Sequence, residues 1–287
     1  MNNSVREMCE YGTEILLRAG IDNAQNEAAE MCMSVLKIDR TALLLYPDRP
    51  VSAEQNELFS SMLSRRISGE PLQYVLGEWS FFGRRFSVGE GVLIPRPETE
   101  QLVDICIGKI KQSGAKFVFD LCAGSGCIGI TVAAECPDTE VYLFELYDGA
   151  FEYLKKNAAA YKNTKTHLVK CDILKGIPEG LPFPDVIISN PPYIPAGEIA
   201  GLQKEVLREP SSALDGGENG LDFYFAIAEK WIPLISAGGF AAVECGEGQA
   251  ERIADVFSAY GTGKPVSDFY GAQRFVILDK FPGTPGQ

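Results

Sequence analysis

The 287-residue sequence contains a single histidine, and this scarcity excludes much familiar catalytic chemistry. A Ser-His-Asp triad or a Cys-His pair would have to use His167, to which we assign a structural role. The eight cysteines form no C-x-x-C pair, so we expect reduced, buried thiols and no zinc site. Neither G-x-x-x-x-G-K-[ST] nor H-E-x-x-H occurs, which argues against a P-loop nucleotide hydrolase and a zinc protease.

Long apolar runs are also missing. No stretch approaches the roughly 18 residues that a membrane-spanning helix needs. The N-terminal sequence MNNSVREMCEYGTE lacks the apolar centre of an export signal, so we expect a cytoplasmic protein without membrane contact. The formal net charge of −13 repels a phosphate backbone. Direct nucleic-acid binding is therefore disfavoured, although a local basic patch would still permit it.

Two patterns precede the main part of the chain. Residues 1–75 carry apolar residues at helical spacing, which predicts a small helical bundle with no chemistry of its own. Between residues 76 and 95, aromatic and β-branched residues are separated by glycines, which predicts a β-hairpin linker. A helix is expected to begin near Pro97, where Glu98 and Glu100 favour its positive end.

From residue 96 to residue 280 the chain alternates between strand-like and helix-like segments. This alternation predicts a parallel, doubly wound α/β sheet. The last two candidate strands have no helix between them and could pair as an antiparallel edge. The final residues, 281–287, are rich in proline and glycine and are expected to form a flexible tail. The candidate strands are 117–121, 141–145, 167–170, 185–189, 239–244, 266–269 and 274–278, and the candidate helices are 127–135, 149–160, 221–235 and 249–259.

A glycine-rich loop follows the first of these strands. Gly124, Gly126 and Gly129 fit G-x-G-x-x-G between a strand and a helix, a pattern that also occurs in purely structural turns. Glu145 ends the next strand about 20 residues later, where an acid can accept both ribose hydroxyls. Together they predict a nucleoside-containing cofactor, either NAD(P) or S-adenosylmethionine. Asp172, after the third strand, either lies near the adenine or is an ordinary loop acid.

The fourth strand ends in the sequence Asn-Pro-Pro-Tyr, at the edge where substrate meets cofactor in an open α/β sheet. Proline fixes its own φ and pushes the preceding residue towards extended geometry, so the side-chain carbonyl of Asn190 is free to accept. The Pro191 carbonyl is likewise outside regular pairing. Two fixed acceptors suit a planar NH2 group, which offers two donors, and Tyr193 can lie over a planar amide or base. The alternative is a turn with a buried tyrosine.

These motifs resemble those of the peptide chain release factor glutamine methyltransferases, the PrmC/HemK family. Asn-Pro-Pro-Tyr is typical of S-adenosylmethionine-dependent methyltransferases that act on planar exocyclic or amide nitrogens. Residues 94–100, Ile-Pro-Arg-Pro-Glu-Thr-Glu, are the feature most specific to this subfamily. The resemblance covers about residues 71–278, and its other supporting stretches are 71–74, 77–78, 91–93, 190–194, 209–210, 213–214, 216–217, 220–221, 244 with 246, and 270–271 with 274.

The resemblance implies a seven-stranded, Rossmann-like methyltransferase domain at 96–280. It implies methyl transfer from S-adenosylmethionine, leaving S-adenosylhomocysteine, to the glutamine amide nitrogen of the Gly-Gly-Gln motif in release factors. The helical bundle and the hairpin would help to dock that protein, and we expect a monomer. The expected catalytic residues are Asn190, Pro191, Pro192 and Tyr193, and the expected cofactor-binding residues are Asp120, Cys122, Ala123, Gly124, Ser125, Gly126, Glu145, Asp172, Ile173 and Asn190.

The sequence departs from the family pattern at the loop and at the acid. The loop is usually Gly-Thr-Gly-Thr-Gly, whereas residues 122–126 read Cys-Ala-Gly-Ser-Gly. The acid is usually Asp, whereas Glu145 is one methylene longer, and Tyr147 and Asp148 replace the usual small residue and proline after it. Neither departure removes the chemistry that cofactor binding needs.

Three alternatives stay open at this point. A DNA or RNA adenine methyltransferase uses the same Asn-Pro-Pro-Tyr logic, but it must grip a polynucleotide and flip a base, against which the acidic charge argues. A non-catalytic binding module could keep the fold, although the intact set of Gly124, Gly126, Glu145 and Asn190 argues against it. A dehydrogenase has no evident use for Asn-Pro-Pro-Tyr.

Overall fold

The computed structural model describes residues 3–280, and the chain divides into two compact units. Among the described residues, one unit is 3–78 together with Lys204–Arg208, and the other is Trp79–Gln203 together with 209–280. The expected tail at 281–287 lies outside the described residues. Within residues 3–280, no helix is both long enough and apolar enough to cross a membrane.

Amphipathic helices form the N-terminal unit. Helices α1 and α4 approach closely at Gly12, where an added Cβ would lie 2.5 Å from the Phe59 ring. Ser52 and Gln55 form a reciprocal capping box that fixes the start of α4. The helices are α1 (Val5–Arg18), α2 (Ala24–Leu36), α3 (Arg40–Leu45), α4 (Ala53–Ile67) and α5 (Leu72–Leu76), and their buried core includes Met8, Leu16, Ala28, Met31, Cys32, Phe59 and Met62.

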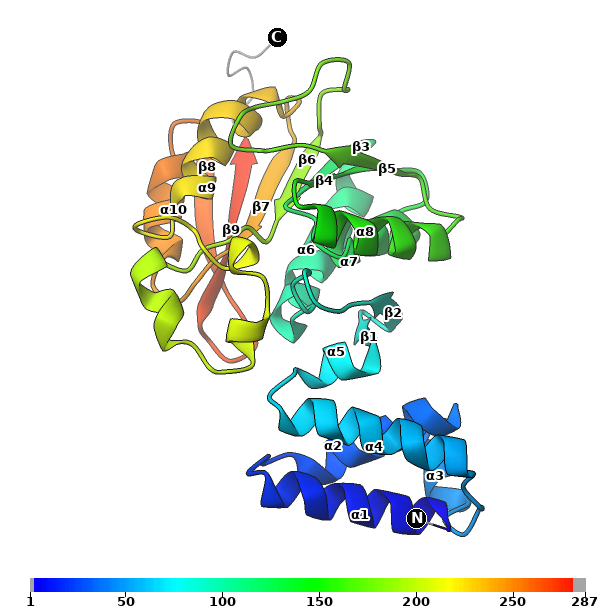
Figure 1. The fold of residues 1–287 in the computed structure, drawn as a ribbon. Helices are drawn as coiled ribbons and strands as arrows, with labels where there is room; N and C mark the ends of the chain where they lie inside the picture. The colour runs from blue at the N-terminus through cyan, green and yellow to red at the C-terminus, as the bar shows by residue number, and fades with distance from the viewer. Residues whose placement is uncertain (1–2, 281–287) are drawn as a thin grey trace. The chain divides into compact units, whose positions relative to one another are not determined.

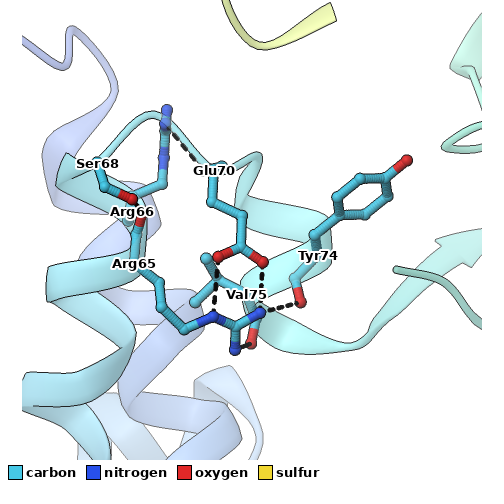
Figure 2. A network of polar contacts seen from close by, with 6 residues as sticks. All are labelled: Arg65, Arg66, Ser68, Glu70, Tyr74 and Val75. Carbon is cyan, nitrogen blue, oxygen red and sulfur yellow. Dashed lines mark hydrogen bonds and ion pairs between the residues drawn. The ribbon is translucent and has the colours of Figure 1, made fainter. Parts of the chain in front are cut away.

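Two arginines at the end of α4 hold the turn into α5. The Arg65 guanidinium faces the Glu70 carboxylate and also donates to the backbone carbonyls of Tyr74 and Val75 at 3.0 and 3.3 Å (Figure 2). Arg66 is buried: its Nε lies 2.6 Å and its Nη2 3.0 Å from the two Glu27 carboxylate oxygens. Arg66 also donates to the Glu70 backbone carbonyl at 3.3 Å, so charge-assisted hydrogen bonds from both arginines fix the turn.

The second unit is built on a seven-stranded sheet with the order β5-β4-β3-β6-β7-β9-β8. The first five strands of that order are parallel, while β9 runs antiparallel to both β7 and β8. Because β4 and β5 lie on one side of β3 and β6 and β7 on the other, the connections change direction between β3 and β6. The strands are β3 (Phe117–Leu121), β4 (Glu140–Glu145), β5 (Thr166–Lys170), β6 (Val186–Ser189), β7 (Phe240–Glu244), β8 (Gly261–Ser267) and β9 (Gln273–Lys280).

Helices cover both faces of this sheet (Figure 1). Because successive strand residues face opposite sides, neighbours such as Val118 and Phe119 enter different cores. One core contains side chains of α6 (Pro97–Ser113), α7 (Cys127–Glu135) and α8 (Asp148–Ala160), and the other contains those of α9 (Asp222–Ala226) and α10 (Ala250–Phe257). The expected doubly wound α/β sheet with its antiparallel edge is thus confirmed.

A short β-hairpin precedes the sheet. Its strands are β1 (Glu78–Phe81) and β2 (Arg84–Ser87), and the turn residues Phe82 and Gly83 have φ values of 50° and 71°. Two positive φ values match the primed turns that suit a two-residue hairpin loop. Glu100 of α6 accepts a hydrogen bond from the Phe82 N–H at 2.8 Å. In α8, the Oδ1 atom of buried Asn157 accepts the Ser87 N–H, and its Nδ2 donates to the Ser87 carbonyl. The hairpin is thereby attached to the helices beside the sheet.

Two elements differ from the sequence-based expectation. The strand expected at 266–269 is β8, Gly261–Ser267, because pairing with β9 extends through Gly261 and Gly263. A Cβ at Gly261 would lie 2.3 Å from the Asp279 carbonyl oxygen, so this glycine permits close pairing with β9, whereas a Cβ at Gly263 would lie 3.1 Å from Ala254 of α10. The helix expected at 221–235 is α9 followed by a π-helical turn, Ile227–Trp231, and a short 3-10 turn that contains Pro233. Proline has no N–H with which to continue the α-helical ladder.

Candidate functional site

A pocket opens at the carboxyl ends of β3, β4 and β6, and its empty space, open solvent included, is about 1050 Å³. This is the point where the strand connections change direction, which is where open α/β sheets bind their ligands. All of its lining residues belong to the second unit. The expected site residues that line it are Cys122, Ala123, Gly124, Ser125, Glu145, Asp172, Ile173, Asn190 and Pro192.

The loop after β3 takes a left-handed backbone conformation at every second residue. Cys122, Gly124 and Gly126 have φ values of 61°, 56° and 82°. A Cβ added to Gly124 would meet only a Val92 methyl at 4.0 Å, so this glycine leaves space at the pocket wall. A Cβ added to Gly126 would lie 2.5 Å from Leu154 Cδ1. Gly124 therefore keeps the pocket open, whereas Gly126 allows the loop to pack against α8.

Asp120, expected at the cofactor, lies in the sheet beneath the loop and does not line the pocket. Its Oδ2 accepts the Gly129 N–H at 2.8 Å, which fixes the first turn of α7. Its Oδ1 is buried and makes no hydrogen bond within residues 3–280. Burial raises the pKa of Asp120 to about 8. The geometry gives this carboxyl a role in shaping the loop.

Glu145 ends β4 with its carboxylate turned into the loop. Its Oε2 accepts the Gly124 N–H at 2.9 Å and its Oε1 accepts the Tyr147 N–H at 2.8 Å. Burial raises the pKa of the carboxyl, and these backbone donors oppose that rise. Because a carboxylate oxygen can accept more than one hydrogen bond, both oxygens retain capacity for ligand hydroxyls.

Asp172 and Ile173 follow β5 on the same side of the pocket. Asp172 accepts the Leu174 N–H at 3.0 Å and pairs with Lys175 at 3.2 Å. Buried Ile173 presents an apolar wall, and its carbonyl accepts the Trp231 Nε1–H at 2.9 Å. An acceptor beside an apolar wall suits a flat heterocycle that carries an amino group.

Asn190 reaches the pocket directly after β6. Its Nδ2 lies 3.3 Å from the Thr99 hydroxyl, so its Oδ1 is the atom left for a ligand. Of the next three residues, only Pro192 lines the pocket; Pro191 and Tyr193 do not. Burial raises the pKa of Tyr193 to about 12, so its phenol stays protonated at neutral pH.

The backbone of the Asn-Pro-Pro-Tyr motif is held in place by residues to which the sequence assigned no role. The Tyr193 carbonyl accepts the Gln249 side-chain amide at 2.9 Å. A Cβ at Gly216 would lie 2.8 Å from the Pro192 carbonyl oxygen, and one at Gly220 would lie 2.2 Å from the Tyr193 carbonyl oxygen. Both glycines therefore stand where another backbone approaches closely. The only sign in the sequence that these two glycines matter was their presence among the family motifs.

A second clamp holds the pocket wall that precedes α6. Glu209 is buried, accepts the Ile94 N–H at 2.9 Å and pairs with the Arg96 guanidinium. Thr99, in the first turn of α6, donates to Glu244 at 2.6 Å. These residues also belong to the family motifs, but the sequence did not indicate their partners. The stretch at 94–100 is thus tied to two distant parts of the chain.

Two family models match the chain. The PrmC N-terminal domain matches residues 7–77, and the methyltransferase small domain matches residues 102–219. The release factor glutamine methyltransferase of Geobacter sulfurreducens is 36% identical over 90% of this chain and 89% of its own length. That of Clostridium botulinum is 33% identical over 96% of this chain and 99% of its own length. The chain belongs to the release factor glutamine methyltransferase family.

A solved structure with little sequence similarity shares the fold. The T. thermophilus 16S rRNA N2 G1207 methyltransferase, in complex with AdoMet and guanosine, is 17% identical with a TM-score of 0.50. The similarity covers 71% of this chain and 49% of that chain. The expected family, the Rossmann-like methyltransferase fold and the S-adenosylmethionine-dependent enzyme class are confirmed together. The individual site residues stay predictions, as do the boundaries at residues 75 and 95.

Proposed function

We propose that this release factor glutamine methyltransferase acts on the glutamine of the Gly-Gly-Gln motif, at its side-chain amide nitrogen. The observation that carries the proposal is the position of Asn190, whose Nδ2 is engaged by Thr99 while the residue lines the pocket. An acceptor oxygen at that place matches the donors of a primary amide. The names of the relatives support a release factor as the protein substrate.

The residues of the pocket fit S-adenosylmethionine. The open space beside Gly124 admits a ligand close to the backbone, and the Glu145 carboxylate can accept the ribose hydroxyls. Asp172 can accept the adenine amino group while Ile173 covers the ring. Two carboxylates in the lining also favour a positively charged ligand. When bound, the cofactor supplies a methyl group on a positively charged sulfur.

Asn190 and Pro191 are proposed to orient the substrate. An amide nitrogen is a poor nucleophile because its lone pair is delocalised into the carbonyl, so alignment at near-attack distance matters. The Asn190 Oδ1 and the Pro191 carbonyl accept the two N–H bonds, which raises electron density on the nitrogen and stabilises the charge that develops there. The nitrogen becomes strongly acidic after transfer and then loses its proton. A base that acts before transfer is therefore not required.

The test is methyl transfer from labelled S-adenosylmethionine to release factors with an intact or a Gln-replaced motif. Label should enter the intact protein alone. Asn190→Ala should lower the transfer rate by about a hundredfold or more, because it removes one preorganised acceptor. Cofactor affinity, measured by calorimetry, should change by only about twofold, since the Asn190 acceptor faces the substrate amide. Equal loss of rate and affinity contradicts this role, and label in DNA or RNA instead of protein favours an adenine methyltransferase.

Three further statements remain predictions for this family member. Residues 1–75 and the hairpin are proposed to dock the release factor, the chain is proposed to act as a monomer, and its location is proposed to be the cytoplasm. Sedimentation of the protein alone and with a release factor tests the first two. A stable dimer, or a complex that forms equally well after charge reversal across the helical surface, contradicts them.

A further inference from the structure

Asn190, Thr99 and Glu244 form a continuous chain of hydrogen bonds at the pocket. Ser189 of β6 pairs with Val243 of β7, so Asn190 and Glu244 are the next residues along two neighbouring parallel strands. Thr99 lies between them, with its hydroxyl oxygen 3.3 Å from Asn190 Nδ2 and 2.6 Å from Glu244 Oε2. Thr99 and Glu244 are both buried, with exposed fractions of 2% and 3%.

The chain has a direction when the Glu244 carboxyl is ionised. A carboxylate can only accept, so the single hydroxyl proton of Thr99 points to Glu244. The hydroxyl oxygen can then only accept from Asn190, which selects the Nδ2 atom for this contact. The Asn190 Oδ1 is thereby left for the substrate. If the Asn190 side-chain amide were rotated by 180°, its own NH2 group would face the NH2 group of the substrate, and no hydrogen bond could form between them.

We propose that Thr99 and Glu244 are positioning residues, which fix the Asn190 amide so that its Oδ1 faces the substrate. The inference rests on the proposed role of Asn190. Neither residue needs to touch the reacting atoms, because Thr99 acts through Asn190 and Glu244 acts through Thr99. The arrangement is specific to a substrate that donates hydrogen bonds, as a primary amide does.

The environment of Glu244 makes this direction dependent on pH. Burial raises the pKa of Glu244 to about 7; the hydrogen bond from Thr99 opposes this rise, as do Arg274 and Arg96, while Glu98 adds to it. A protonated Glu244 becomes a donor to Thr99, whose own proton is then free to turn towards Asn190 and reverse the preference. Transfer should therefore fall as pH falls through this range. The other titratable groups facing Glu244 are Cys127, Tyr193, Tyr224 and Cys245, whose pKa values are all raised, so they stay neutral.

The experiment measures single-turnover methyl transfer by the full-length enzyme with saturating S-adenosylmethionine and release factor. Thr99→Val keeps the shape but removes the hydroxyl, and it should lower the rate about tenfold, as expected for one lost orienting hydrogen bond. Thr99→Ser should recover most of that loss. Glu244→Gln should lower the rate at pH 8 by a similar factor and abolish the decline on the acid side. The double variant should be no slower than either single variant, because both act through one chain.

Thr131→Val is the matched control. Its hydroxyl is also buried, in α7, but makes no hydrogen bond within residues 3–280, so its removal should leave the rate within about twofold. Calorimetric affinity for the cofactor should stay within a few fold in every variant. The proposal is overturned by wild-type rates in Thr99→Val, by an unaltered acid decline in Glu244→Gln, or by loss of cofactor affinity in step with rate. An inactive wild-type enzyme would instead refute the proposed function.

Discussion

Gly126 offers the sharpest test of how the cofactor loop is built. Both Gly124 and Gly126 have left-handed backbones, with φ values of 56° and 82°, so alanine at either position is strained. Only Gly126 is also enclosed: an added Cβ would lie 2.5 Å from Leu154 Cδ1 and 2.9 Å from Ile130 Cδ1. The same substitution at Gly124 would project into the pocket.

The two substitutions should therefore differ in a measurable way. Left-handed geometry costs an alanine about 1–2 kcal/mol, and this applies to both. Overpacking adds about 1–3 kcal/mol at Gly126 alone. Alanine also has less conformational entropy than glycine in the unfolded chain, which stabilises the folded state by about 0.4–1 kcal/mol in each case. Gly126→Ala should thus be less stable than Gly124→Ala by about 1–3 kcal/mol, a difference from which the shared terms cancel.

Urea denaturation followed by tryptophan fluorescence measures this difference. Both tryptophans, Trp79 and Trp231, belong to the second unit, so the signal reports on the unit that contains the loop. Calorimetry should show the opposite ranking for cofactor affinity, with at least about tenfold loss in Gly124→Ala, where the methyl occupies ligand space. Equal losses of stability in the two variants, or a larger loss of affinity in Gly126→Ala, would refute this division of roles.

Two further outcomes concern buried charges. Arg66→Met should lower the free energy of unfolding of the N-terminal unit by about 3–5 kcal/mol, because it leaves Glu27 buried without its cation. Arg65→Met should lower it by only about 1 kcal/mol, because Arg65 is half exposed. Hydrogen exchange in α2 and α4 of the full chain measures both. Asp120→Asn should flatten the pH dependence of stability between pH 4 and about 8. The folded state keeps the Asp120 proton to higher pH than the unfolded state does. The free energy of unfolding of the wild type therefore falls as pH rises through this window, by up to about 1.4 kcal/mol per pH unit. Urea denaturation at pH 6 and pH 8 measures the free energy of unfolding at each pH. The same change between the two pH values in wild type and Asp120→Asn would contradict the prediction.

Local patterns predicted the elements whose cause is local. The candidate strand at 117–121 and the candidate helix at 127–135 coincide with β3 and α7, because a buried apolar run and a glycine loop mark their ends. The extent of β8 was missed because Gly261 and Gly263 are typical of turns, and only pairing with β9 makes them strand residues. Pairing with a strand that the topology places alongside cannot be predicted from the residues of the segment itself.

The same distinction separates the predicted parts of the site from the missed ones. Glu145 ends one strand and Asn190 directly follows another, so the carboxyl edge of the sheet places both from sequence. Thr99 and Glu244 are 145 residues apart and meet only because α6 begins beside the ends of β6 and β7. Sequence motifs named both residues, but a motif does not state which atom faces which. The hydrogen-bond direction at Asn190 depends on contacts that exist only in the folded chain.

The cysteine at position 122 shows how the loop tolerates a departure from its family. The usual Gly-Thr-Gly-Thr-Gly places glycine at each residue that is left-handed here, namely 122, 124 and 126. Cys122 keeps this conformation at φ 61°, at a cost of about 1–2 kcal/mol for a residue with a Cβ. Its neighbours impose the geometry, because the Ala123 N–H donates to Phe144 and the Gly126 N–H donates to Ala123, both at 2.8 Å. Since burial raises the pKa of the Cys122 thiol, the substitution adds a neutral side chain and leaves the carboxylates as the charged groups that receive the cofactor.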